Sequence, residues 1–170
     1  MESITRPHSF MSDCPDILIL GVGNILLGDE GVGVHVIREL QKEKLPPNIE
    51  LMDAGTALFS VLHLLEKRKK IVVIDAAKGG KPPGTIYRIL PSRIKSEHNK
   101  LLSLHEMGLI ECLAAMEAKA RPRDMVIIGV EPDSIDWNLQ LSRALQQKLP
   151  EIVKAVMSEI SNHQVRQITK

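Results

Sequence analysis

The residues best placed to do chemistry are two adjacent carboxylates, Asp29 and Glu30, at the expected start of a helix. They follow an apolar run, residues 17–20, and a turn that contains Gly21 and Gly23, which is the strand, turn and helix layout of a nucleotide site. Backbone N–H groups and the helix dipole at such a position hold an anion, and two carboxylates would repel a phosphate there. The pair therefore favours a bound cation over a nucleotide.

Three more acidic residues, Asp53, Asp75 and Glu131, stand at or just after the ends of expected strands. In open α/β sheets, ligands bind outside the carboxyl ends of the strands, near the point where the strand order reverses. If the first and third strands are neighbours, Glu30 and Asp75 face each other across this crevice. Two carboxylates held that close repel, so one takes up a proton unless a cation joins them.

His105 is the third candidate metal ligand. Ser103 and Glu106 have the spacing of a capping box, which places His105 in the first turn of a helix. The positive end of the helix dipole disfavours imidazolium there, and neutral imidazole is the form that binds metal. His98 is an alternative in a polar loop. Each of the three candidates also has an ordinary structural explanation, as a cap, a turn residue or a surface histidine, so the prediction depends on their convergence.

Composition narrows the class of protein. The 170-residue chain has a formal net charge of +1 and only 2% aromatic residues, which argues against nucleic-acid and anionic-membrane binding. No apolar run approaches the roughly 20 residues of a membrane span. Cys14 and Cys112 form no disulfide framework, so we expect a reduced, cytoplasmic protein. The near-zero net charge and the lack of an obvious exposed apolar stripe make a monomer the expectation.

The elements that must position these residues alternate between strands and helices. The expected strands are Ile17–Gly21, Ile49–Asp53, Ile71–Asp75, Thr85–Leu90 and Met125–Val130, and the expected helices are about Asp29–Lys44, Leu58–Lys67, Leu104–Lys119 and Leu139–Ser161. This pattern predicts an α/β fold, a three-layer sandwich whose mostly parallel, twisted sheet of about five strands has helices on both faces. Only a short loop precedes Thr85–Leu90, so we expect that strand to be an antiparallel edge strand. Residues 1–15 are interpreted as a flexible leader and residues 16–170 as a single domain.

Outside the site, three features have structural interpretations. Pro150 lies inside the last helical pattern, and we expect it to break or kink the helix and to open a second one. The basic run Lys67–Lys70 is interpreted as a solvated helix end. His35 and His63 are interpreted as surface residues in the middle of helices.

Taken together, five motifs in this order resemble the nickel–iron hydrogenase maturation endopeptidases. The resemblance covers roughly residues 16–160. The motifs are GVGNILLGDEGVGVHVI at 21–37, DAGT at 53–56, IDAAKGGKPPGTI at 74–86, SLHEMGL at 103–109 and IGVEP at 128–132. The resemblance implies an α/β domain that removes a short C-terminal extension from a hydrogenase large-subunit precursor after nickel insertion.

The resemblance also implies site residues. The metal-binding residues of the family fall on Glu30, Asp75 and His105, and the aspartate of its D-G-G-T motif falls on Asp53. We expect Asp53 to be the catalytic candidate, near the site in substrate recognition or just outside the ligands. Two carboxylates and one imidazole leave open coordination positions and suit nickel, which the precursor is expected to supply, although other divalent metals also fit. The resulting expectation is a metal-dependent endopeptidase of the aspartic or metallo type.

The sequence departs from the family pattern at three positions. Ala54 stands where the family has glycine, Leu104 replaces a proline, and Asn138 follows Trp137 in place of a glycine. These changes alter loop shape, and so the choice of precursor, more than the three candidate ligands. Two alternatives stay open at this point: a nucleotide- or dinucleotide-binding α/β protein, and a hydrogenase-assembly chaperone that docks the precursor without cutting it.

Overall fold

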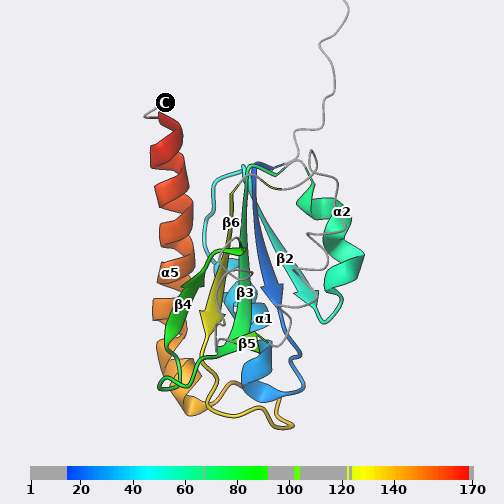
Figure 1. Cartoon of the computed structure of the whole chain (residues 1–170), viewed down its shortest axis with the longest axis vertical. Coiled ribbons are helices and arrows are strands. Elements are labelled where there is room, and N and C mark those ends of the chain that lie inside the picture. Colours follow the sequence, from blue (N-terminus) through cyan, green and yellow to red (C-terminus); the bar gives the residue numbers. More distant parts are fainter. Residues whose placement is uncertain (1–14, 67, 92–101, 104–121, 123, 169–170) are drawn as a thin grey trace, which may run out of the picture.

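The structure is a computed structural model that describes residues 15–66, 68–91, 102–103, 122 and 124–168 (Figure 1). Residues 1–14 of the expected leader, the expected helix Leu104–Lys119 and the candidate residues His98 and His105 lie outside these ranges. So do both cysteines. In the part of the chain that the structure describes, no helix is both long and apolar enough to cross a membrane.

A central sheet organises the molecule (Figure 1). Its main strands follow the order β2-β1-β3-β6-β4, and β5 pairs with β3 outside this path. β1, β2, β3 and β6 are parallel neighbours, whereas β4 runs antiparallel to β6 and β5 antiparallel to β3. The strands are β1 (Ile17–Val22), β2 (Ile49–Gly55), β3 (Lys70–Lys78), β4 (Ile86–Ile89), β5 (Leu102–Ser103) and β6 (Asp124–Val130). The expected antiparallel edge strand is thereby confirmed.

Helices cover both faces of this sheet. They are η1 (Gly28–Gly31), α1 (Val32–Leu40), η2 (Leu58–Val61), α2 (Leu62–Leu65) and α5 (Arg143–Ile168). Strand residues alternate between two apolar clusters, so that Ile19 packs on the side of α1 and α5 while Leu20 packs on the side of η2 and α2. Strands buried on both faces need the nearly continuous Val, Ile and Leu runs that β1, β3 and β6 contain. The predicted three-layer α/β fold is confirmed.

Pro150 does not break the last helix, contrary to expectation, because α5 runs from Arg143 to Ile168 through it. A proline inside a helix removes one backbone hydrogen bond and crowds the preceding turn. The flanking residues Leu145, Ile152 and Val156 are fully buried against the sheet. Their burial holds both halves of α5 against the sheet and outweighs the local cost.

The basic run Lys67–Lys70 is not a solvated helix end at its described positions, so that interpretation was wrong for two residues. Arg68 is 4% exposed, and its guanidinium donates to the carbonyl oxygens of Leu64 and Pro15 and to the Glu50 carboxylate. Lys70 is 2% exposed. Burying a charge is costly unless it is paired, so these two side chains depend on partners that are remote in sequence.

Lys70 belongs to a buried ionic network at the start of β3. Its Nζ lies 2.9 Å from Asp124 Oδ2 and 3.7 Å from Glu159 Oε2. Arg88 Nε donates to Glu159 Oε1 at 2.5 Å. The Arg88 hydrogen bonds, together with the charges of Arg88 and Lys70, hold the pKa of Glu159 below its ordinary value despite its burial. The network clamps β3, β4, β6 and α5 together.

Replacing Lys70 with alanine is expected to lower the free energy of unfolding by about 3 kcal/mol, because removal of one partner leaves buried charge uncompensated. Lys69→Ala is the matched control, since Lys69 pairs with Asp16 at 2.8 Å but its side chain is 55% exposed. That exposed pair is worth about 1 kcal/mol or less. Urea denaturation of both variants measures the difference, and equal losses would show that the Lys70 network contributes no more than a surface pair.

Candidate functional site

The candidate site lies at the carboxyl ends of β1 and β3, where the strand order reverses (Figure 1). From β1 the chain passes through η1 and α1 to β2 on one side, and β3 flanks β1 on the other side. Reversal points of this kind leave a crevice beyond the strand ends. The sequence-based condition for Glu30 and Asp75 to approach each other, that the first and third strands are neighbours, is therefore met.

Glycines let the start of α1 lie directly on the strand ends. A Cβ atom at Gly23, whose φ is +133°, would lie 1.9 Å from the carbonyl oxygen of Glu30. A Cβ at Gly33 would lie 2.3 Å from the carbonyl oxygen of Ile74. Only glycine permits such approaches. The glycine pattern that resembles a nucleotide turn thus serves backbone packing, which brings Glu30 over the end of β1 and Gly33 against the residue before Asp75.

Asp75 is almost fully buried inside β3, at 3% exposed. Its Oδ1 accepts the N–H of Ala76 at 2.8 Å. The strand does not end at Asp75 as expected but continues to Lys78, because Ala76 pairs with β6 and Ala77 pairs with Ser103 of β5. Ser103 consequently lies opposite a position two residues along β3 from Asp75.

The predicted trio of ligands is only partly placed. Glu30 and Asp75 lie at the same edge of the sheet, and His105 lies outside the described residues. Among residues 15–66, 68–91, 102–103, 122 and 124–168, no three histidine, cysteine, aspartate or glutamate side chains form a group that could hold a metal. The assignment of Glu30, Asp75 and His105 as metal ligands stays a prediction.

Asp53 is exposed near the end of β2 and shapes that end. Its Oδ1 accepts the N–H of Gly55 at 2.9 Å, and Gly55 adopts a φ of +49°. The Gly55 carbonyl in turn accepts the N–H of Gly23 at 2.9 Å. Asp53 is therefore linked through two hydrogen bonds to the turn that precedes Glu30, which puts an exposed carboxylate close to the candidate site.

Asp29 has a role that sequence reasoning missed. It is fully buried, at 0% exposed. Its Oδ2 accepts the N–H groups of Asp133 at 2.8 Å and Ser134 at 3.3 Å, and its Oδ1 accepts that of Ser142 at 2.7 Å. Ser142 then caps α5 by accepting the N–H of Leu145 at 3.2 Å. Asp29 thus fastens the loop of residues 131–142 beside the site, and no local sequence signal shows this because its partners lie more than a hundred residues away.

Glu131 is likewise structural and does not present an open carboxylate to the crevice. It is 6% exposed and accepts the N–H groups of Gly79 at 2.7 Å, Gly80 at 3.2 Å and Lys81 at 3.3 Å, as well as the Tyr87 hydroxyl. Burial alone would raise the pKa of Glu131, but these hydrogen bonds outweigh it and lower that pKa below its ordinary value. Burial and the Glu131 contact raise the pKa of Tyr87 to about 12.

Tyr87→Phe tests this carboxylate. At neutral pH the loss of a hydrogen bond to a charged group is expected to cost about 1.5–3 kcal/mol. Because the pKa of Glu131 is lowered by folding, its stabilisation is present above about pH 4.3, its value in the unfolded chain, and is lost as pH falls through the folded value. Without the Tyr87 hydroxyl, folding lowers the pKa of Glu131 by a smaller amount. The free energy of unfolding should therefore fall less steeply as the pH decreases in Tyr87→Phe than in wild type. If urea denaturation gave the same dependence of the unfolding free energy on pH below pH 5 for both proteins, the hydrogen bond from Tyr87 to Glu131 would not be the cause of the lowered pKa.

His35 differs from its expected surface position. Its side chain is half-buried, and its Nε2 is enclosed without a hydrogen-bond partner among the residues that the structure describes. Burial and the nearby Arg38 lower the pKa of His35, against the opposing charges of Asp29 and Glu39. The imidazole is therefore held neutral on α1. His63 is exposed, as expected.

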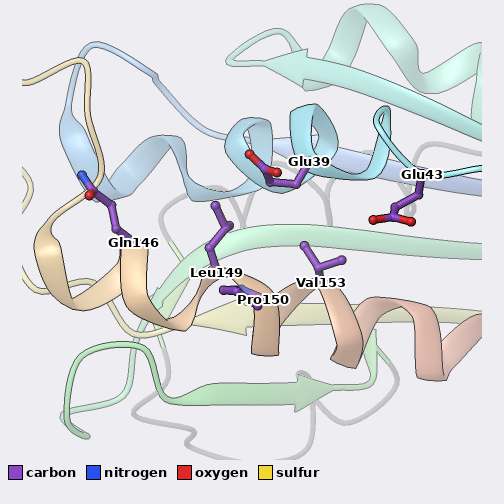
Figure 2. A pocket seen from close by; sticks show the side chains of 6 residues that line it. All are labelled: Glu39, Glu43, Gln146, Leu149, Pro150 and Val153. Carbon is purple, nitrogen blue, oxygen red and sulfur yellow. The ribbon is translucent and has the colours of Figure 1, made fainter.

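A cleft of about 430 Å³ lies elsewhere, between α1 and α5. Figure 2 shows Leu149 and Val153 pointing from α5 toward α1, with Glu39 and Glu43 along the opposite wall. Its lining comprises Glu39, Glu43, Gln146, Leu149, Pro150 and Val153. Glu39 lies at the end of α1 that is far from Glu30, and Glu43 lies three residues beyond that end. The cleft is therefore separate from the candidate site.

Comparisons with known proteins agree on one family. A family model described as hydrogenase maturation protease matches residues 34–159. The hydrogenase 2 maturation protease of Escherichia coli (strain K12) is 29% identical over 157 residues, which cover 91% of this chain and 96% of that protein. The hydrogenase expression/formation protein HupD of Rhizobium leguminosarum bv. viciae is 31% identical over 84% of this chain and 73% of its own length.

A solved structure supports the same relationship. The hydrogenase maturating endopeptidase HybD from E. coli superposes on this chain with a TM-score of 0.75 at 27% identity, covering 86% of this chain and 93% of that chain. The family resemblance that was inferred from the motifs is thereby confirmed. Because the family model matches well over half of the residues, the chain belongs to the hydrogenase maturation protease family and is a hydrolase.

Proposed function

We propose that this protein is the endopeptidase that removes the C-terminal extension of a nickel-loaded nickel–iron hydrogenase large-subunit precursor. The observation that carries the proposal is the placement of Glu30 and Asp75 at one reversal point of the sheet, with the close packing at Gly23 and Gly33 holding them there. Two carboxylates held at one reversal point attract a cation, because without one they repel each other. We therefore infer that Glu30 and Asp75 recognise a metal cation that the precursor carries.

Nickel enters the proposal as part of the precursor. Glu30, Asp75 and His105 are the residues that would hold it, and His105 follows two residues after Ser103, which β5 sets beside β3 near Asp75. Two carboxylate oxygens and one imidazole nitrogen suit a borderline divalent metal and leave positions open to the substrate's own donors. These residues would hold the ion, and the chemistry that it would supply there is Lewis-acid polarisation of a substrate carbonyl.

The catalytic class that we propose is a metal-dependent endopeptidase in which carboxylates, rather than serine or cysteine, serve the reaction. Asp53 supports this because it is exposed beside the site and is held in orientation by its bond to Gly55. We place Asp53 against the segment to be cleaved. The partner is the large-subunit precursor, and the protein is proposed to act in the cytoplasm as a monomer, with neither nucleic acid nor membrane involved.

Intact-mass measurement tests this function directly. The purified protein is incubated with the large-subunit precursor, once with nickel inserted and once without it. Loss of a C-terminal peptide from the loaded form alone is the expected result. No cleavage of a verified, loaded cognate precursor would favour a chaperone that docks the precursor and does not cut it.

A further inference from the structure

Three large apolar side chains are exposed beside the candidate site, where the composition predicted no such surface. Trp137 is 82% exposed, Leu139 60% and Leu26 44%. Scattered exposed apolar residues are common on proteins, so exposure alone carries no function. These three residues differ from scattered exposed residues because hydrogen bonds join the backbone segments that carry them. We call Leu26, Trp137 and Leu139 the Trp137 surface.

Backbone hydrogen bonds join two loops here that are far apart in the sequence. Leu27 and Asn138 form a parallel β-bridge. In it, the N–H of Asn138 donates to the Leu26 carbonyl at 3.0 Å and the N–H of Gly28 donates to the Asn138 carbonyl at 2.8 Å. The loop after β1 and the loop after β6 thus share one short ladder.

The bridge brings the backbones of the three apolar residues together. Trp137 and Leu139 are the immediate neighbours of Asn138 in the chain. The hydrogen bond from the Asn138 N–H to the Leu26 carbonyl places Leu26 beside the same stretch. The three exposed side chains therefore arise from one short, bridged piece of backbone.

The surface is rigidly supported from below. Asp29 holds the backbone of residues 133, 134 and 142, as described above. The side chain of Asn24 accepts the N–H of Leu26 at 3.0 Å, and that of Asn138 accepts the N–H of Gln140 at 2.9 Å. An apolar surface whose backbone is already ordered loses little conformational entropy on binding, which favours affinity.

The position of the surface identifies what covers it. Leu26 stands four residues before Glu30, so their Cα atoms are within about 15 Å of each other. A protein interface of ordinary size buries about 800 Å² on each partner, equivalent to a disc of about 16 Å radius. Trp137 is joined through Asn138 to Gly28, two residues from Glu30. A protein substrate that brings its nickel to Glu30 therefore covers the Trp137 surface.

We propose that Leu26, Trp137 and Leu139 form the docking surface for an apolar patch on the folded body of the large-subunit precursor, with Trp137 as the main anchor. The identity of this partner rests on the proposed function. Tryptophan is enriched among the few interface residues that supply most of the binding energy. Trp137 is next to Asn138, whose carbonyl accepts the N–H of Gly28 in the loop that leads to Glu30. Asn138 forms the bridge with its backbone and accepts the N–H of Gln140 with its side chain, so it fixes the shape of this surface and contributes to the choice of precursor.

Steady-state processing of the nickel-loaded precursor by Trp137→Ser and Leu139→Ser tests the proposal. Trp137→Ser is expected to raise KM about tenfold or more and to leave kcat within about twofold, because docking and not the reacting groups is altered. Lys154→Ala, on the exposed face of α5, is the control and should change neither constant. An unchanged KM in Trp137→Ser, with wild type cleaving normally, would overturn the docking surface and leave the proposed function intact.

A second readout does not need cleavage. The chain contains one tryptophan, so 5-fluorotryptophan labelling gives a single ¹⁹F resonance from position 137. Its shift on addition of precursor supports the proposal, even if the precursor stays uncut and the proposed protease activity fails. A shift that instead follows the protein's own concentration would assign the surface to contacts between two copies and overturn the proposal, as would no shift with a precursor that wild type cleaves.

Discussion

Glu30→Gln is expected to lower cleavage of the nickel-loaded precursor at least about a hundredfold while the protein stays folded. Glutamine has the shape of glutamate but lacks the negative charge that stabilises a bound divalent cation. Losses of 10–100-fold accompany changes merely around metal ligands, so removal of a ligand charge costs at least as much. Intact-mass time courses with the loaded precursor measure the rate, and thermal melting verifies the fold. Asp75→Asn and His105→Ala should behave alike.

Glu39→Gln supplies a matched control for Glu30→Gln. Glu39 lies near the end of α1, the helix that follows the η1 turn of Glu30, but it lines the separate cleft, and its ion pair with Lys42 is at the surface. The same chemical change there should leave cleavage near the wild-type rate. If Glu30→Gln also cleaved at the wild-type rate, Glu30 would be removed from the metal site. If both variants were equally impaired, the loss would reflect the charge of the helix rather than one ligand.

Asp29→Ala is expected to lower the free energy of unfolding by about 3 kcal/mol. The substitution removes the acceptor of three backbone N–H groups, and each buried donor left without a partner costs about 1–3 kcal/mol, which water offsets in part because Asp133 and Ser134 are exposed. Asp29→Asn should recover part of the loss, since one side-chain oxygen is kept. Urea denaturation at neutral pH gives the comparison.

Asp136→Ala is the corresponding control, because Asp136 is an exposed aspartate in the same loop. Its replacement should change the free energy of unfolding by no more than about 0.5 kcal/mol. A similarly small effect of Asp29→Ala would mean that the loop of residues 131–142 keeps its conformation without the buried carboxylate.

Most of the sheet could be predicted from local patterns. The buried runs of β1, β3 and β6 consist of β-branched and aliphatic residues, and the short connection before β4 leaves no space for a crossover helix, which requires an antiparallel strand. That Glu30 follows β1 and that Asp75 lies on the neighbouring β3, one residue beyond the last pair with β1, followed from the same patterns, although β3 continues past Asp75 to Lys78. His105 lies outside the described residues, and its assignment stays a prediction.

The rest depended on contacts between residues far apart in sequence. Arg68 and Lys70 stand in a basic run that is typical of a solvated surface, and only the distant carboxylates of Glu50, Asp124 and Glu159 permit their burial. Asp29 could not be distinguished from its neighbour Glu30 by type or spacing. Pro150 is tolerated because residues on both sides of it are anchored in the core. Sequence patterns report only on residues that are near one another along the chain. The burial of Arg68 and Lys70, the role of Asp29 and the tolerance of Pro150 depend on contacts with residues that are distant in the sequence.

The order of the strands also has a consequence for how quickly the protein becomes competent. β3 pairs with β6 from Lys70 opposite Asp124, which are 54 residues apart, and β1 pairs with β3 across a similar interval. Sheets closed by such remote pairings fold slowly, over milliseconds to seconds, because chain entropy is lost before the contacts that compensate for it form. During synthesis, β3 must wait for residues near 130 before β6 can pair along its length. A nascent chain that already contains Glu30 and Asp75 is therefore not yet an enzyme.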